Sequence, residues 1–218
     1  MPITPKQKQK GIFSYCVKYT EKDVKNRIGY TDVDGAGEQG YFSLVFFNFS
    51  MNLSIGPKAP EVCQAIIEVP RGSQNKYEFD KEQGIVKLDR VLFSPMFYPC
   101  DYGFFPETLG GDGDPLDVLV MVTNPLFPGV AVDVRPIGVL VMSDDKGQDE
   151  KILAVAKDDP RMKHINDLAD VSQHVRDEIS FFFEKYKILE KKDTKIEGWQ
   201  NAAAAKKLIQ EGIERAKA

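Results

Sequence analysis

The chain has 218 residues, of which 42% are hydrophobic and 28% are charged. This composition is ordinary for a globular protein, and it excludes both a chain that is disordered throughout and a fibrous repeat. The formal net charge of −4 argues against a general nucleic-acid-binding protein, because such a protein needs a basic face to displace counterions.

Residues 1–50 differ from the rest, and we expect an N-terminal extension of unknown role ahead of one domain over residues 51–218. The first segment carries a net charge of +2 and the second a net charge of −6. The segment 35–40 fits the pattern G-x-G-x-x-G, which in dinucleotide-binding proteins follows a strand and opens a helix. Here a β-rich run, 41–47, follows the pattern, so we interpret the glycines as a flexible turn.

The segment from residue 66 to about residue 156 has the pattern of short strands. Residues 76–79 alternate polar with aromatic side chains, as in a half-buried strand, and the turn 81–84 predicts a hairpin with the next strand. The apolar run 118–122 is typical of a buried strand. The expected strands, in chain order, are 66–69, 76–79, 85–92, 118–122, 130–134, 137–142 and 152–156.

The last quarter of the chain changes to a helical period. Apolar residues recur at three- and four-residue steps between Val175 and Tyr186, which predicts an amphipathic helix with Ser172 as its N-cap. A second helix is expected from about Asn201 to Lys217, where alanines favour helix. Many short strands followed by helices predict an α+β fold with a small β-barrel and flanking C-terminal helices.

The three cysteines, Cys16, Cys63 and Cys100, are odd in number and widely spaced, which disfavours a zinc site or a disulfide framework. A reducing compartment, the cytoplasm, is therefore expected. No apolar run approaches the ~20 residues of a membrane-spanning helix, and the N-terminus lacks the apolar block of a secretory signal. We therefore expect no association with a membrane.

The strongest chemical signal is the segment 112–117, DGDPLD. Its three carboxylates lie within six residues and repel one another unless a cation lies among them. Carboxylate oxygens are the ligands that hard divalent cations such as Mg²⁺ and Mn²⁺ prefer. Taken alone, the segment is also consistent with a solvated acidic turn. An EF-hand calcium loop is excluded, because the positions that require Gly and Glu hold Asp117 and Thr123.

Further charged residues lie on the expected strands and their turns. Asp144 and Asp149 belong to a second acidic cluster, and Asp149 shares a strand face with Lys151. The same spacing separates Lys76 from Glu78, although each pair taken singly also fits an exposed strand face. Many carboxylates with a few Lys, Arg and Tyr side chains predict a site for a metal-complexed polyanion, in which basic groups bind phosphate oxygens. The sequence has no P-loop motif, which excludes a Walker-type NTPase.

These residues resemble those of the family I soluble inorganic pyrophosphatases of the short bacterial type. The segment 112–118, DGDPLDV, matches the family signature in full, and the similarity covers about residues 60–217 in collinear order. Residues 1–50 have no counterpart in it. Further matching segments are EVP at 68–70, KYE at 76–78, DR at 89–90, FYPCDYG at 97–103, RPIGV at 135–139, DEK at 149–151, FEKYK at 183–187 and EGW at 197–199.

The resemblance implies a five-stranded OB-like barrel with flanking helices, a homo-oligomer that is typically a hexamer, and a set of metal ligands. Asp112, Asp117 and Asp149 would be ligands of the principal metals, with Asp117 bridging two of them. Asp144 would bind further metals that arrive with the substrate, and Glu68 would lie at the outer metal shell.

The resemblance also implies catalytic and phosphate-binding residues. Asp114 would be the base that helps to deprotonate the attacking water, and Tyr102 would serve both catalysis and substrate binding. Glu78 and Tyr98 would support the site. The implied phosphate ligands are Lys76, Arg90, Tyr102, Lys151, Tyr186 and Lys187. Which lysine of the pair 191–192 approaches the phosphates stays open.

The implied reaction is hydrolysis of inorganic pyrophosphate to two phosphates by a metal-activated water. It would use several Mg²⁺ ions per site, with Mn²⁺ or Zn²⁺ as substitutes, and basic groups would neutralise charge on the leaving phosphate. The alternatives are a phosphoanhydride hydrolase of broader specificity, a non-catalytic metal or phosphate sensor, and an OB-type module that binds nucleic acid. The net charge of −6 over residues 51–218 disfavours the last of these.

Overall fold

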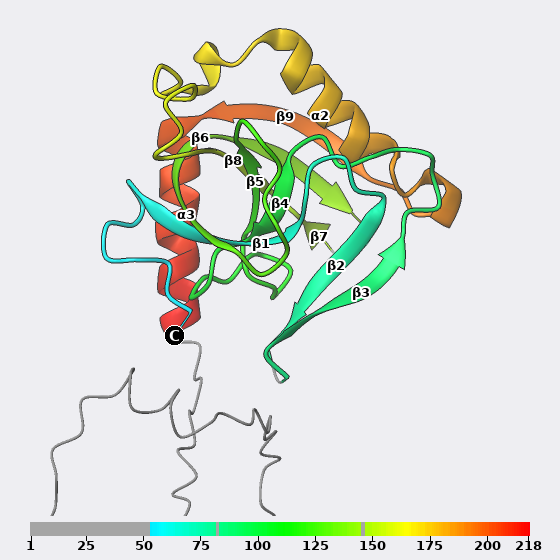
Figure 1. Ribbon diagram of the computed structural model, residues 1–218, viewed down its shortest axis with the longest axis horizontal. Helices are drawn as coiled ribbons and strands as arrows, with labels where there is room; N and C mark the ends of the chain where they lie inside the picture. Colours follow the sequence, from blue (N-terminus) through cyan, green and yellow to red (C-terminus); the bar gives the residue numbers. More distant parts are fainter. Residues whose placement is uncertain (1–52, 82, 145–146) are drawn as a thin grey trace, which may run out of the picture. The chain divides into compact units, whose positions relative to one another are not determined.

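Five strands close into a ring in the computed structural model, which describes residues 53–81, 83–144 and 147–218. In neighbour order the strands are β1 (Cys63–Val69), β4 (Asp101–Phe104), β5 (Asp117–Met121), β8 (Lys151–Ala156) and β6 (Ala131–Asp144). Pairing of β6 with β1 closes the ring (Figure 1). All pairs in the ring are antiparallel except β5 with β8, which is parallel. The expected five-stranded barrel is confirmed. The expected extension 1–50, with its Gly-rich segment 35–40, lies outside the described residues.

The remaining strands lie along β6 or outside the ring. β7 (Gly147–Gln148) and β9 (Lys195–Asn201) pair with β6. β2 (Asn75–Asp80) and β3 (Ile85–Val91) form a separate antiparallel hairpin, as the sequence predicts. Figure 1 shows this hairpin projecting beside the ring.

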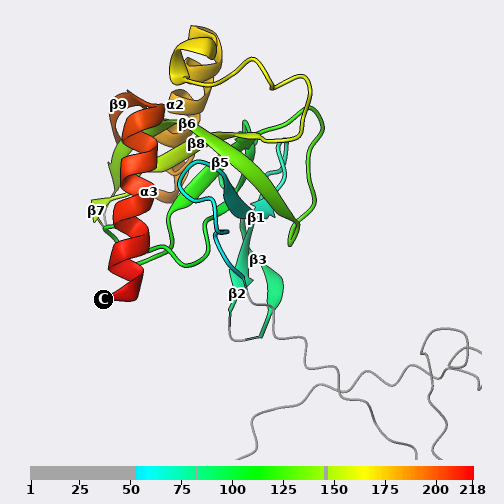
Figure 2. The same ribbon diagram turned by 90° about the vertical axis from the view of Figure 1, so that its left-hand side faces the viewer.

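Two α-helices follow the barrel strands, as expected. The hydroxyl of Ser172, the predicted N-cap, accepts a hydrogen bond from the backbone N–H of Val175 at 3.4 Å, and α2 (Gln173–Lys185) begins there. α3 (Ala202–Lys217) begins after Asn201 and packs against β6 and β9, whereas α2 packs against β9 (Figure 2). Within the described residues, no helix combines the length and the apolar character needed to cross a bilayer.

The 3₁₀ turns η1 (Leu168–Asp170) and η2 (Ile188–Glu190) lie on either side of α2 in the chain. η2 joins the end of α2 to β9, and its last residue leads into the left-handed residue Lys191. The turn therefore redirects the chain immediately after the tyrosine–lysine pair 186–187.

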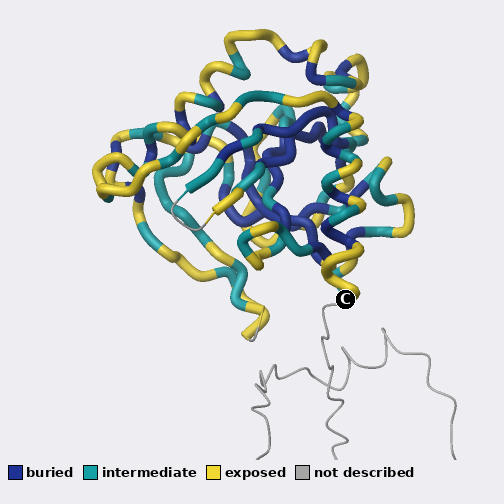
Figure 3. The backbone as a smooth tube through the Cα atoms, turned by 180° about the vertical axis from the view of Figure 1, so that it is seen from behind, coloured by how far each residue is buried: buried dark blue, intermediate teal, exposed yellow. Residues whose placement is uncertain are grey.

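Two hydrophobic clusters cover the two faces of the ring strands. Leu119 and Leu153 belong to the cluster that includes residues of α2, and Val118 and Ile152 belong to the cluster that includes residues of α3. Buried segments trace most of the ring in Figure 3. Burial on both faces explains why β5 and β8 are continuous apolar runs and do not alternate.

The structure differs from the sequence prediction in β6, β4 and β9. The expected strands 130–134 and 137–142 are one strand, β6, with a register shift between Pro136 and Gly138. Proline has no N–H to donate, so it interrupts the ladder, and the strand continues beyond it as a bulge. Neither β4 nor β9 is predicted, because β4 lies in an aromatic-rich segment and β9 alternates poorly.

Candidate active site

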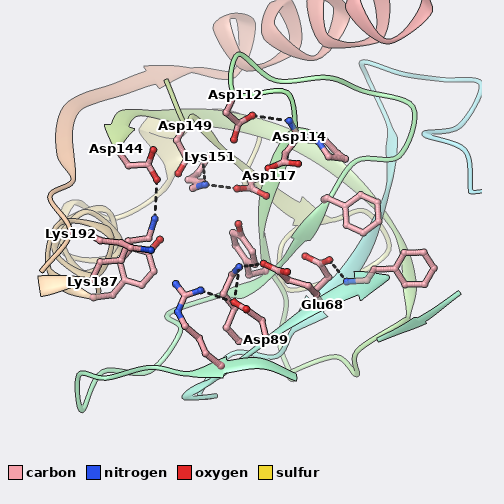
Figure 4. Close-up of a pocket in the computed structure, with 18 of the residues that line it drawn as sticks. Glu68, Asp89, Asp112, Asp114, Asp117, Asp144, Asp149, Lys151, Lys187 and Lys192 are labelled. Carbon is pink, nitrogen blue, oxygen red and sulfur yellow. Dashed lines mark hydrogen bonds and ion pairs between the residues drawn. The ribbon is translucent and has the colours of Figure 1, made fainter. Parts of the chain in front are cut away.

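A pocket of about 520 Å³ opens between the ring, the β2–β3 hairpin and the segment that follows α2 (Figure 4). Its lining combines carboxylates with basic groups, and several of them form ion pairs with one another. The lining carboxylates are those of Glu68, Glu78, Asp89, Asp112, Asp114, Asp117, Asp144 and Asp149. The other polar lining residues are Lys76, Lys81, Arg90, Tyr102, Lys151, Tyr186, Lys187 and Lys192.

The acidic loop before β5 is folded on itself. Gly113 has a φ of 88°, a left-handed conformation that favours glycine, and it lets the chain turn between two aspartates. The N–H of Asp114 donates to Oδ1 of Asp112 at 3.1 Å, and the N–H of Gly110 donates to the carbonyl of Asp114 at 2.7 Å. Because β5 starts at Asp117, the loop brings all three carboxylates to one pocket wall.

Lys151 lies at the centre of the acidic group. It is the register partner of Asp117 in the parallel pair β5–β8, and its Nζ contacts carboxylate oxygens of both Asp117 and Asp149. The Lys151 side chain is only 3% exposed. Burial alone would lower the pKa of Lys151, but the charges of the two aspartates outweigh it and raise this pKa above its ordinary value. Lys151 is therefore a buried ammonium between two anions.

A β-bulge places Glu68 at the pocket. The register of β1 against β4 shifts between Ile67 and Val69, and a bulge of this kind changes the direction of the side chain it carries. Oε1 of Glu68 accepts a hydrogen bond from the N–H of Phe79 at 2.7 Å, which ties β1 to the hairpin. Burial raises the pKa of Glu68 to about 7.

A second bulge explains a site residue that sequence reasoning missed. Lys76 pairs with Arg90 and Tyr77 pairs with Leu88, so the register skips Asp89. Regular alternation would place Asp89 and Arg90 on opposite faces, whereas the bulge lets both line the pocket. Oδ2 of Asp89 accepts from Nζ of Lys76 at 3.3 Å and from Nη1 of Arg90 at 2.6 Å. In the sequence, the only indication that Asp89 belongs to the site was its place beside Arg90 in the matching segment 89–90.

The segment after α2 forms another wall of the pocket. Nζ of Lys187 lies 2.9 Å from Oδ2 of Asp144 and 5.3 Å from the centroid of the Tyr186 ring. Among the described residues, Lys192 lines the pocket and Lys191 does not. Lys191 has a φ of 56°, and this left-handed turn redirects the chain between the two lysines. Of the two lysines that the sequence left open, Lys192 is therefore the one positioned at the pocket.

The two predicted site tyrosines before the acidic loop differ in position. Tyr102 lines the pocket, and burial together with the charge of Asp117 raises its pKa well above the ordinary value, so its phenol stays protonated and can donate. Tyr98 is 2% exposed and does not line the pocket. Its ring packs 5.5 Å from that of Tyr102 and 4.9 Å from that of Phe182, measured between centroids.

The donor set fits hard cations by its chemistry. Within the described ranges, no three Asp, Glu, His or Cys side chains converge closely enough to hold one ion. Asp117 and Asp149 are instead drawn to the ammonium of Lys151, and Asp144 to that of Lys187. Carboxylate oxygens are the donors that Mg²⁺ prefers, and Lys151 shows that a positive charge is accommodated between Asp117 and Asp149, so the residues present fit such an ion.

Comparison with known proteins gives consistent matches. The family model described as inorganic pyrophosphatase matches residues 65–217. The inorganic pyrophosphatase of Halalkalibacterium halodurans is 54% identical over 158 residues, which cover 72% of this chain and 97% of that protein. The one from Thermus thermophilus is 52% identical over 169 residues, with coverages of 76% and 97%. The crystal structure of inorganic pyrophosphatase from Thermus thermophilus aligns with a TM-score of 0.74 at 51% identity, over 76% of this chain and 97% of that one.

Proposed function

The chain belongs to the family I inorganic pyrophosphatases and hydrolyses inorganic pyrophosphate, and we propose that the pocket described above is where it does so. The observation that carries the proposal is the pairing of carboxylates with lysines inside one pocket, as at Lys151 and Lys187. A site that must bind metal ions and a polyanion together needs both kinds of group at close range. The family is metal-dependent.

The metal ligands we propose are five of the carboxylates that line the pocket. Asp112, Asp117 and Asp149 would hold the principal ions, Asp144 would hold ions that enter with the substrate, and Glu68 would lie in the outer shell. The proposed ion is Mg²⁺, several per site, with Mn²⁺ or Zn²⁺ as substitutes. When bound, such ions would neutralise phosphate charge and increase the acidity of a water molecule.

The chain's own groups would bind the phosphates and move the proton. A carboxylate oxygen of Asp114 would accept the proton of the attacking water, and the protonated phenol of Tyr102 would donate to a phosphate oxygen. The ammonium and guanidinium groups would neutralise the leaving phosphate, so catalysis would be mainly positioning and electrostatic stabilisation. Glu78, which contacts Lys76, and Tyr98, which packs on Tyr102, would support them. The proposed phosphate ligands are Lys76, Arg90, Tyr102, Lys151, Tyr186, Lys187 and, from its position, Lys192.

Chelation tests the metal requirement. We expect EDTA in excess to abolish release of phosphate from pyrophosphate, and excess Mg²⁺ to restore it, because Lys151 and Lys187 neutralise carboxylates but cannot increase the acidity of a water molecule as a bound ion would. Phosphate release measured with Mg²⁺, Mn²⁺ and Zn²⁺ in turn would rank the ions. Activity that survives complete chelation would contradict the proposal. Hydrolysis of ATP or tripolyphosphate at a comparable rate would instead indicate the broader phosphoanhydride specificity.

We propose that residues 51–218 are the catalytic domain, that residues 1–50 are an extension, and that the enzyme is cytoplasmic. The Halalkalibacterium halodurans relative aligns over 97% of its own length with 72% of this chain. Among the described cysteines, Cys63 and Cys100 are buried free thiols, and burial raises the pKa of each to about 12. Such unreactive thiols suit a reducing compartment.

We propose a homohexamer as the assembly. The support lies in apolar side chains that a single copy leaves exposed on and after β3, on α2 and on η2. Exposed apolar patches mark interaction surfaces in proteins, so these side chains are candidates for contacts between copies. These side chains are Leu88, Phe93, Phe97, Phe181, Ile188 and Leu189, each at least 55% exposed.

A charge placed on this surface tests the assembly. We expect the double variant F181E/I188E to have a lower mass by light scattering than the unmodified chain, because a carboxylate buried between copies lacks a partner. The variant K207E changes an exposed side chain on α3, 78% exposed, and should leave the mass unchanged. A wild-type mass other than that of six copies at working concentration would contradict the proposal.

A further inference from the structure

Glu190 is a nearly buried carboxylate that has no role in the proposed chemistry. It is the last residue of η2, and its side chain is 8% exposed. It does not line the pocket, although Lys192, two residues later, does. A carboxylate is taken out of water only where a specific partner compensates it, so its partner indicates its role.

That partner is the guanidinium of Arg90, which does line the pocket. Nε of Arg90 donates to Oε1 of Glu190 at 3.2 Å, across 100 residues of sequence, and Nη1 donates to Asp89 at 2.6 Å. None of the hydrogen bonds between described residues uses Nη2. Two edges of the planar group are therefore held by carboxylates, and Nη2 is left for a ligand in the pocket.

We infer that Glu190 is a positioning residue that fixes the guanidinium of Arg90 for the pyrophosphate. The inference rests on the proposed function of Arg90 as a phosphate ligand. Arg90 comes from the hairpin and Glu190 from the segment after α2, so the ion pair also sets the distance between two walls of the pocket. A rigid guanidinium loses less freedom when it binds phosphate, and small misplacements of such groups are costly in rate.

The sign of the effect separates positioning from simple electrostatics. A negative charge near a phosphate site repels the substrate, so an electrostatic role alone predicts that removal of the Glu190 charge lowers KM. Positioning predicts the opposite, because a mobile Arg90 binds the phosphate less well. Glutamine keeps a carbonyl oxygen that can accept from Nε, so E190Q should retain most of the orientation that E190A loses.

The experiment compares the kinetics of E190A, E190Q, R90K and the double variant R90K/E190A in the full-length protein with Mg²⁺. We expect E190A to raise KM and to lower kcat/KM by about 10-fold, and E190Q to stay within about 3-fold of the wild type. R90K should lower kcat/KM by about 10-fold or more, because lysine cannot reproduce the fork of donors. The double variant should be within about 2-fold of R90K, since Glu190 acts only through Arg90.

Controls separate the ways in which the inference can fail. E184A removes an exposed glutamate on α2, with its side chain 44% exposed, and should behave as wild type. Thermal melts of every variant show whether a loss reflects unfolding, and in that case E190Q carries the test. Three outcomes would overturn the inference but not the proposed role of Arg90. They are losses that multiply in the double variant, a lower KM in E190A, and wild-type kinetics in E190A while R90K is defective. Wild-type kinetics in R90K would overturn the proposed role of Arg90 and the inference with it.

Discussion

The variant D117N is expected to lose at least about 100-fold of the rate of pyrophosphate hydrolysis while the barrel stays folded. Asn has nearly the shape of Asp, so the change removes a charge and one anionic oxygen without creating a cavity. Asp117 starts β5 and is the register partner of Lys151, so its position is fixed by the backbone. The loss should therefore come from the missing ligand. Phosphate release in saturating Mg²⁺, with a circular dichroism melt of the same sample, measures both quantities.

The matched control for this prediction is D158N. The Asp158 side chain is 82% exposed and pairs only with Lys157, at 3.4 Å, among the described residues. D158N makes the same chemical change outside the pocket, so its turnover should equal that of the wild type. Equal turnover for D117N and D158N would remove Asp117 from the proposed metal site.

The second large effect concerns Lys151 in the absence of metal. We expect K151M to lower the stability of the chelated protein by about 3 kcal/mol, because removal of one partner of a buried ion pair leaves uncompensated charge. For a domain of this size the loss corresponds to about 6–12 °C in melting temperature. Mg²⁺ should recover much of it, since an ion held by Asp117 and Asp149, as proposed, would supply the lost positive charge. The Mg²⁺-induced rise in Tm should therefore be larger for K151M than for wild type.

Activity of K151M should fall together with its metal-free stability, by about 100-fold or more if Lys151 binds a phosphate oxygen. K157M is the control, because Lys157 follows the same strand with its side chain 34% exposed. Differential scanning fluorimetry of wild type, K151M and K157M, each with EDTA and with Mg²⁺, gives the six melting temperatures required. If chelated K151M melts at the same temperature as chelated wild type, the Lys151 ammonium does not stabilise the fold by neutralising the two aspartates.

The barrel strands were largely predictable because their apolar pattern is strong. The continuous apolar run of β5 matches its burial directly, whereas β2, outside the ring, alternates in sequence although nearly all of its residues are half-buried. β4 could not be predicted, because it contains Gly103, a residue that is rare within strands. Glycine is required there since β4 lies so close to β1 that a Cβ would be 1.9 Å from the carbonyl oxygen of Ile66. A close approach between strands is a tertiary property that no local pattern contains.

The site residues were predicted through the resemblance more than through their spacing. The segment 112–117 suggests a cation site because three carboxylates lie within six residues, but taken alone it also fits a solvated acidic turn. Asp89 and Glu190 are different, since one depends on a bulge in β3 and the other meets Arg90 from 100 residues away. Neither a two-residue alternation nor a helical period can place such side chains.

The aspartates that line the pocket beside Lys151 are held in two different ways. Backbone hydrogen bonding fixes the spacing of Asp117 and Lys151, whereas Asp112 and Asp114 belong to a turn held by its own short-range bonds. At the proposed metal site we therefore expect a change of cation radius to displace Asp112, in the turn, more than Asp117, on the strand.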